Sequence, residues 1–152
     1  MNLKMYLPVL MVVCAVVVVS GCTGSGNEFS NDQISFSYPS DWNVTDQGGN
    51  KLLLEIGGPT IMVGELFQDR PSNANEYKNV IWKEWTWNQS TINGNTVYQG
   101  FSNGSSSNID PTLGYYKAIF VKGNQTYYLQ IHGTRTDIED GYNQIVNSFQ
   151  IK

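Results

Sequence analysis

The sequence has few of the residue types from which catalytic and metal sites are built. Its 152 residues include one His and two Cys, and 14% of them are charged. The formal charge is −4, and a chain this acidic lacks the basic surface that neutralises the phosphates of a nucleic acid. The composition, with 40% hydrophobic and 12% aromatic residues, also argues against collagen-like and coiled-coil classes.

Catalytic motifs are missing as well. The sequence has no Gly-rich phosphate loop with a Lys, no zinc helix with two His, and no nucleophile elbow. His132 could act as a general base, but a partly solvated strand side chain explains it better. Asp137, Glu139 and Asp140 could bind a divalent ion, but acidic residues in the first turn of a helix are also stabilised by the helix dipole. We therefore expect a non-enzymatic protein without a metal or cofactor.

One long apolar run stands at the N-terminus. Met5–Val19 follows Lys4 and precedes Ser20-Gly21-Cys22, a pattern typical of a signal peptide that ends in a lipobox. We expect cleavage after residue 21 and a lipid on Cys22, which would hold the protein on the outer face of the cytoplasmic membrane. The run is shorter than the roughly 20 residues of a spanning helix. An uncleaved anchor and a plain secretory signal are the alternatives.

The remainder has the size of a single domain. Loss of Cys14 with the signal and lipidation of Cys22 would leave no free thiol, hence no disulfide and no Cys nucleophile. Residues 22–33 are rich in Gly, Ser and Asn, which predicts a flexible tether. Residues 34–152 would then form the globular domain.

Alternation of apolar and polar residues predicts a strand-rich domain. The expected strands are 34–38, 42–45, 52–56, 61–67, 90–92, 96–101, 115–121 and 125–133. Asn93-Gly94 and Gly123-Asn124 are strong signals for tight hairpins. The polar run 102–111 is expected to be a mobile loop.

Two helices are expected beside these strands. Helical spacing predicts one over residues 74–85, with Tyr77, Val80, Ile81 and Trp85 buried. A capping box at Thr136–Glu139 opens the second. Its predicted buried stripe is Ile138, Tyr142, Ile145, Val146 and Phe149. The order of elements indicates an α+β domain with a mainly antiparallel sheet flanked by helices.

Two kinds of surface residue could carry a function. Trp82 and Trp87 lie off the predicted buried stripe and could contact a partner or a ligand, because Trp supplies a large rigid contact area. A covering loop or second layer is the simpler interpretation of Trp82. Asn103 is the best glycosylation acceptor among four Asn-x-Ser/Thr sequons.

Three segments resemble PsbP-like domains in the order that this family has them. They are ISFSYPSDWNV at Ile34–Val44, the hairpin GNQTYYLQI at Gly123–Ile131, and IVNSFQI at Ile145–Ile151. In particular, the chain resembles the small PsbP-related lipoproteins of archaea rather than the photosynthetic subunit. The resemblance implies an α/β/α sandwich around an antiparallel sheet and no enzymatic activity. Photosynthetic members are accessory subunits that dock on a membrane complex and help to retain its ions, but no ligand set here matches a metal site.

These observations favour a lipid-anchored accessory or scaffold domain that binds a protein complex of the envelope. The alternative is a module that binds a small molecule or glycan in an aromatic-lined cleft near Trp82 and Trp87. A hydrolase centred on His132 ranks third.

Overall fold

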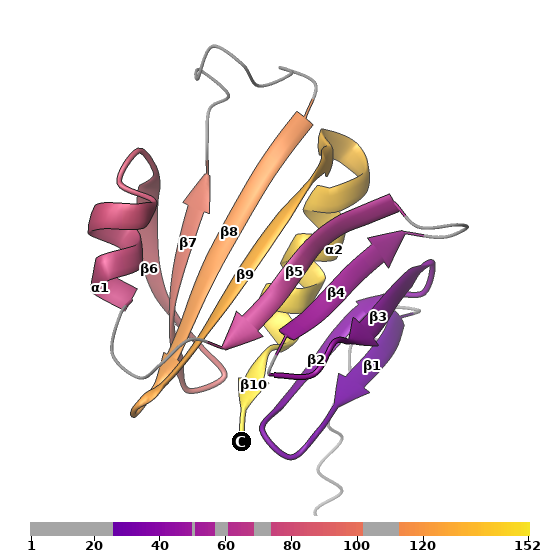
Figure 1. The fold of residues 1–152 in the computed structure, drawn as a ribbon, viewed down its shortest axis with the longest axis horizontal. Coiled ribbons are helices and arrows are strands. Elements are labelled where there is room, and N and C mark those ends of the chain that lie inside the picture. The colour runs from indigo at the N-terminus through magenta and orange to yellow at the C-terminus, as the bar shows by residue number, and fades with distance from the viewer. Residues whose placement is uncertain (1–25, 50, 57–60, 69–73, 102–112) are drawn as a thin grey trace, which may run out of the picture.

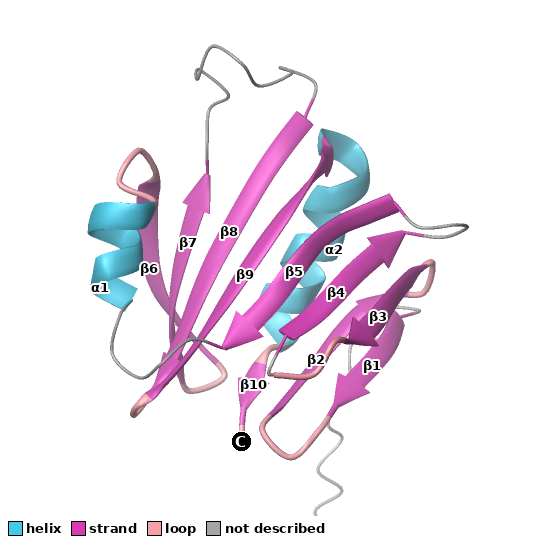
Figure 2. Cartoon of the chain, viewed as in Figure 1, coloured by secondary structure: helices cyan, strands magenta, loops and turns pink. Residues whose placement is uncertain are grey.

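The computed structural model describes residues 26–49, 51–56, 61–68, 74–101 and 113–152. These residues form two antiparallel sheets, one long helix and one short helical segment (Figures 1 and 2). The expected signal peptide, Cys22, Asn103 and the loop at 102–111 lie outside the described residues. Within the described part, no helix is long and apolar enough to cross a membrane.

The larger sheet has seven strands in the order β3-β4-β5-β9-β8-β7-β6, and each neighbouring pair is antiparallel. Its strands are β3 (Trp42–Asp46), β4 (Lys51–Ile56), β5 (Ile61–Gln68), β6 (Thr86–Ile92), β7 (Asn95–Phe101), β8 (Leu113–Lys122) and β9 (Gln125–Thr134). The predicted strands are all present, with bounds shifted by a few residues. Fold class is therefore confirmed at the level of an antiparallel sheet.

Both predicted hairpins are confirmed. Asn93 and Gly94 join β6 to β7 with φ values of 51° and 77°, the left-handed backbone that a type I′ turn requires. Gly123, at φ 61°, begins the two-residue turn between β8 and β9. Such a turn fixes which residues lie opposite each other along both strands.

A smaller sheet, in the order β1-β2-β10, lies beside the larger one. It contains β1 (Gly26–Ser30), β2 (Ile34–Pro39) and β10 (Gln150–Ile151). The expectation of a flexible tether is therefore wrong for residues 26–30. Phe29 explains the difference, because its ring stacks on Phe36 at 5.3 Å between centroids, and one apolar residue in a polar stretch leaves no periodicity to detect.

The main core lies between the large sheet and α2 (Arg135–Ser148). The predicted stripe of this helix is confirmed, and its five members are completely buried. Trp42 packs on Gly141, where a Cβ atom would lie 2.4 Å from the indole. From the segments that carry the family resemblance, Phe36, Trp42 and Phe149 all belong to this core, so those motifs describe packing.

The opposite face of the large sheet carries a much shorter cover (Figure 1). It consists of α1 (Ala74–Glu76) and a π-helical turn, η1 (Tyr77–Ile81). The helix expected over residues 74–85 is thus wrong in length. Its predicted buried face is right in part, because Tyr77 and Trp85 pack against the aromatic cluster whereas Ile81 is exposed. The backbone N–H of Trp82 donates to the carbonyl of Tyr77 at 2.7 Å, five residues back, as in a π turn.

The π turn changes which residues meet the sheet. Trp82 meets the stacked rings of Tyr77 and Tyr128 edge to face and is 8% exposed, while Ile81 is 53% exposed. The expected α/β/α sandwich is accordingly found in part, because one face has a full helix and the other has only this short segment. The fold is dominated by its sheet.

An aromatic pocket around Lys117

The β8–β9 hairpin sets out a polar row on the sheet face away from α2. Lys117 lies opposite Gln130, and Tyr115 lies opposite His132. Their neighbours Tyr116 and Ile131 point into the main core, as the alternation of a strand requires. Lys117 and His132 therefore share one face with the short helical cover.

Gly100 makes room for an aromatic cluster next to this row. It lies opposite Lys117 on one side and Trp87 on the other, and a Cβ atom here would lie 2.8 Å from the Trp87 ring. Trp87 then stacks on Trp82 with 5.8 Å between ring centroids. Tyr77 and Tyr128 stack at 3.9 Å. The π turn thus rests on a continuous layer of rings.

Lys117 lies at the edge of this layer. Its ammonium nitrogen is 4.0 Å from the Trp82 ring centroid and 4.7 Å from that of Trp85, within range of a cation–π interaction. In the part of the chain that the structure describes, it forms no ion pair with a carboxylate. Burial lowers the pKa of Lys117 to about 8, because the charged form loses water without gaining an anion.

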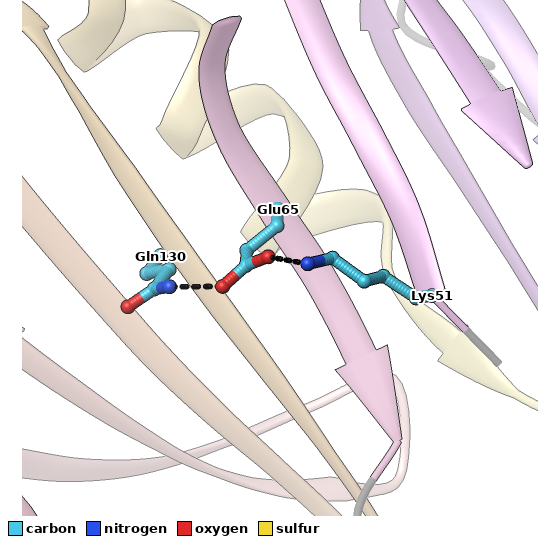
Figure 3. Close-up of polar contacts among 3 residues, drawn as sticks. All are labelled: Lys51, Glu65 and Gln130. Carbon is cyan, nitrogen blue, oxygen red and sulfur yellow. Dashed lines mark hydrogen bonds and ion pairs between the residues drawn. The ribbon is translucent and has the colours of Figure 1, made fainter. Parts of the chain in front are cut away.

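Glu65, which lies opposite Gln130 on β5, already has an ion-pair partner. Lys51 lies 2.5 Å from its Oε2 atom, and the side-chain amide of Gln130 donates to its Oε1 atom (Figure 3). Gln130 therefore stands between Glu65 and Lys117. This arrangement leaves Lys117 as the uncompensated charge of the row.

An open pocket of about 340 Å³ lies beside Lys117. It is lined by Trp85, Tyr115, Lys117, Gln130, Ile131 and His132. The His132 and Tyr115 rings lie nearly parallel, with 6.1 Å between their centroids. Aromatic walls with a few polar groups are typical of a site for a small ligand.

The structure brings the two predicted contact residues together but covers one of them. Trp82 is buried, with an edge-to-face contact to Tyr77 and a stacked contact to Trp87, whereas Trp87 is half-buried. Lys117, Tyr115 and the pocket-facing role of Trp85 were not anticipated. The Gly123-Asn124 turn was the available signal for the first two, because counting back from it pairs Lys117 with Gln130 and Tyr115 with His132.

The other candidates have ordinary structural surroundings. Glu139 and Asp140 are exposed near the start of α2, and Glu139 accepts a hydrogen bond from the Tyr116 hydroxyl at 3.1 Å. The side chain of Asp137 is outside the described residues. Among described residues, no three His, Cys, Asp or Glu side chains lie close enough together to hold a metal ion.

Comparison with known proteins identifies the fold. No family model matches the chain, and neither does any curated protein. The solution structure of cyanobacterial PsbP (CyanoP) from Synechocystis sp. PCC 6803 is similar, with a TM-score of 0.56 and 10% identity over 87% of this chain and 96% of that one. A crystal structure from Bacteroides thetaiotaomicron VPI-5482 has the same TM-score and 15% identity over 85% of this chain. This chain spans about half of that protein, 49% of its length. The chain thus has a PsbP-like fold.

Proposed function

We propose that this chain is a non-enzymatic, lipid-anchored accessory or scaffold protein that binds a protein complex of the envelope. The observation that carries the proposal is the PsbP-like fold, shared with cyanobacterial PsbP over most of both chains. The sequence resemblance to archaeal PsbP-related lipoproteins supports the same role. Fold alone does not define a function. The proposal therefore also depends on the lipoprotein signal and on the lack of catalytic motifs in the sequence.

The N-terminal sequence supports an anchor on the outer face of the cytoplasmic membrane. Lys4, the apolar run and Ser20-Gly21-Cys22 have the order of a lipoprotein signal. Two acyl chains on Cys22 would suffice for stable anchoring. Because β1 begins at Gly26, only three residues lie between it and Cys22, so the Cα atoms of Cys22 and Gly26 can be at most about 14 Å apart. The domain would sit against the bilayer surface.

Affinity co-purification from host membranes tests this proposal. The bait is the full-length native protein, and Cys22→Ser is the mislocalised control. We expect one envelope complex to be enriched with the native bait and lost with Cys22→Ser. Mass spectrometry of the native protein should also find the lipid on Cys22. Membrane anchoring without any enriched complex would contradict the accessory role, and an unmodified Cys22 would contradict the anchor.

The pocket supports a second candidate function, the binding of a small molecule. Trp85, Tyr115 and His132 provide aromatic walls, and Lys117 and Gln130 provide polar groups. The volume of about 340 Å³ is at the small end of the range of ligand sites. This location replaces the cleft expected near Trp82 and Trp87, since Trp82 is largely covered.

A further inference from the structure

The charges around the pocket favour one class of small molecule. Glu65 is paired with Lys51 and accepts a hydrogen bond from the Gln130 amide, while Lys117 has only aromatic rings as partners among the described residues. A partly buried ammonium without a counter-ion favours an anion that can reach it, because opposite charges interact more strongly away from water. The pocket gives that access, since Lys117 lines it.

We propose that the pocket binds a small anion with a planar ring, such as an aromatic carboxylate. The carboxylate would pair with the Lys117 ammonium, and the ring would lie against Trp85 and the Tyr115–His132 pair. Charge-assisted hydrogen bonds are stronger than neutral ones, and aromatic rings favour offset or edge contacts with other rings. This inference rests on the second candidate function and specifies its ligand.

The four tryptophans allow a direct binding test. Trp82 and Trp85 contact Lys117 and Trp87 stacks on Trp82, whereas Trp42 lies in the main core. The probe is benzoate, titrated into the intact 15N-labelled protein while the indole N–H signals are followed by NMR. We expect saturable shifts of the Trp82 and Trp85 signals and none for Trp42. Benzamide, which has the same shape without the charge, should bind at least about tenfold more weakly.

Variants at two lysines separate the role of charge from that of packing. Lys117→Met removes the charge and keeps the length, and it should weaken benzoate binding at least about tenfold. Lys117→Arg keeps the charge and should restore most of the affinity. Lys78→Met is the matched control, because Lys78 also lies over a ring, 3.5 Å from the Tyr98 centroid, but does not line the pocket. It should leave binding unchanged.

Raising the pH provides an independent readout. Lys117 faces Gln130 and His132 of β9, Gly100 of β7 and the rings of Trp82 and Trp85, with Glu65 beyond Gln130. Loss of the ammonium proton should weaken benzoate binding as the pH rises through and above about 8. Lys117→Arg should bind independently of pH over that range, because guanidinium stays protonated.

A panel of probes distinguishes failure of this inference from failure of the binding function. Equal affinity for benzoate and benzamide, or no effect of Lys117→Met in a folded protein, would overturn the anion site. Binding of a neutral methyl glycoside in its place would do the same while leaving a small-molecule function intact. If neither benzoate, inorganic phosphate nor the glycoside shifts any indole signal, both the anion site and the small-molecule function are contradicted.

Discussion

At the scale of single residues, Lys117 is the clearest departure from ordinary protein interiors. Buried lysines are usually paired with an acid, but this one lies against two indole rings. Cation–π contact offsets part of the lost hydration, while burial lowers the pKa of Lys117 to about 8. The folded state therefore holds this proton less tightly than the unfolded chain does.

We predict that the stability of the protein rises between pH 8 and pH 10 because of Lys117. In this window the unfolded chain still binds the lysine proton, near its usual pKa of 10.5, while the folded state has released it. Stability increases with pH wherever the unfolded state binds more protons. Urea denaturation at several pH values should show this rise in the native protein. Lys117→Met should be more stable at pH 7 and should lose the rise.

The predicted rise in stability ends near pH 10, where the tyrosines of the unfolded chain titrate. Burial raises the pKa values of Tyr127 and Tyr142 above their usual 10, so the unfolded chain loses their protons first and stability falls above pH 10. This fall should persist in Lys117→Met. A rise between pH 8 and 10 that also persisted in Lys117→Met would show that another group causes it.

The pocket residues that could be predicted from the sequence are those whose position follows from the strand register. The Gly123-Asn124 turn is a local signal, and it fixes every pair along β8 and β9, including Lys117 with Gln130. The approach of Trp85 to Lys117 has no such signal. It depends on the backbone conformation after η1. That conformation is stabilised by ring contacts between elements far apart in sequence.

At the scale of elements, α2 and η1 differ in how well their sequences specify them. The stripe of α2 repeats over three turns and every member is buried, so periodicity was sufficient. Residues 74–85 have helical spacing too, but the stacking of Tyr77 on Tyr128 and the contact of Trp82 with the same ring favour a π turn. Tertiary packing here overrides local preference.

We predict opposite outcomes for two adjacent residues of this turn. Trp82→Ala should lower the free energy of unfolding by about 3 kcal/mol or more, as expected for an aromatic side chain removed from a core. Ile81→Ala should change it by less than about 0.5 kcal/mol, because Ile81 is more than half exposed. Chemical denaturation measures both. A regular α-helix through residue 85 would give the reverse order, with Ile81 the costly position.

At the scale of the whole molecule, the β6–β7 hairpin is hydrogen-bonded to the C-terminal end of α2. Asn95 at the β6–β7 turn is completely buried, and its side-chain amide donates to the carbonyl of Phe149 at 3.0 Å. Asn93 donates to the carbonyl of Asn147 at 2.9 Å. These bonds satisfy carbonyls that a helix end leaves without partners. A hairpin at one edge of the large sheet thus caps a helix 54 residues later in the chain.

Asn95→Ala should therefore destabilise the hairpin and α2 together. It removes the shorter of two hydrogen bonds to the buried Phe149 carbonyl, which still accepts from Asn93 at 3.3 Å, and should cost about 1 kcal/mol. Hydrogen exchange should show faster exchange in β6, β7 and the last turn of α2. Asn93→Gly is the comparison variant, because glycine accepts the φ of 51°. It removes the exposed bond to Asn147 and the longer bond, 3.3 Å, to Phe149, so its effect should be smaller. Faster exchange confined to β6 and β7 would mean that the cap does not couple the sheet edge to the helix, and the aromatic contacts of Phe149 with Phe36, Phe120 and Tyr127 would then hold that helix end by themselves.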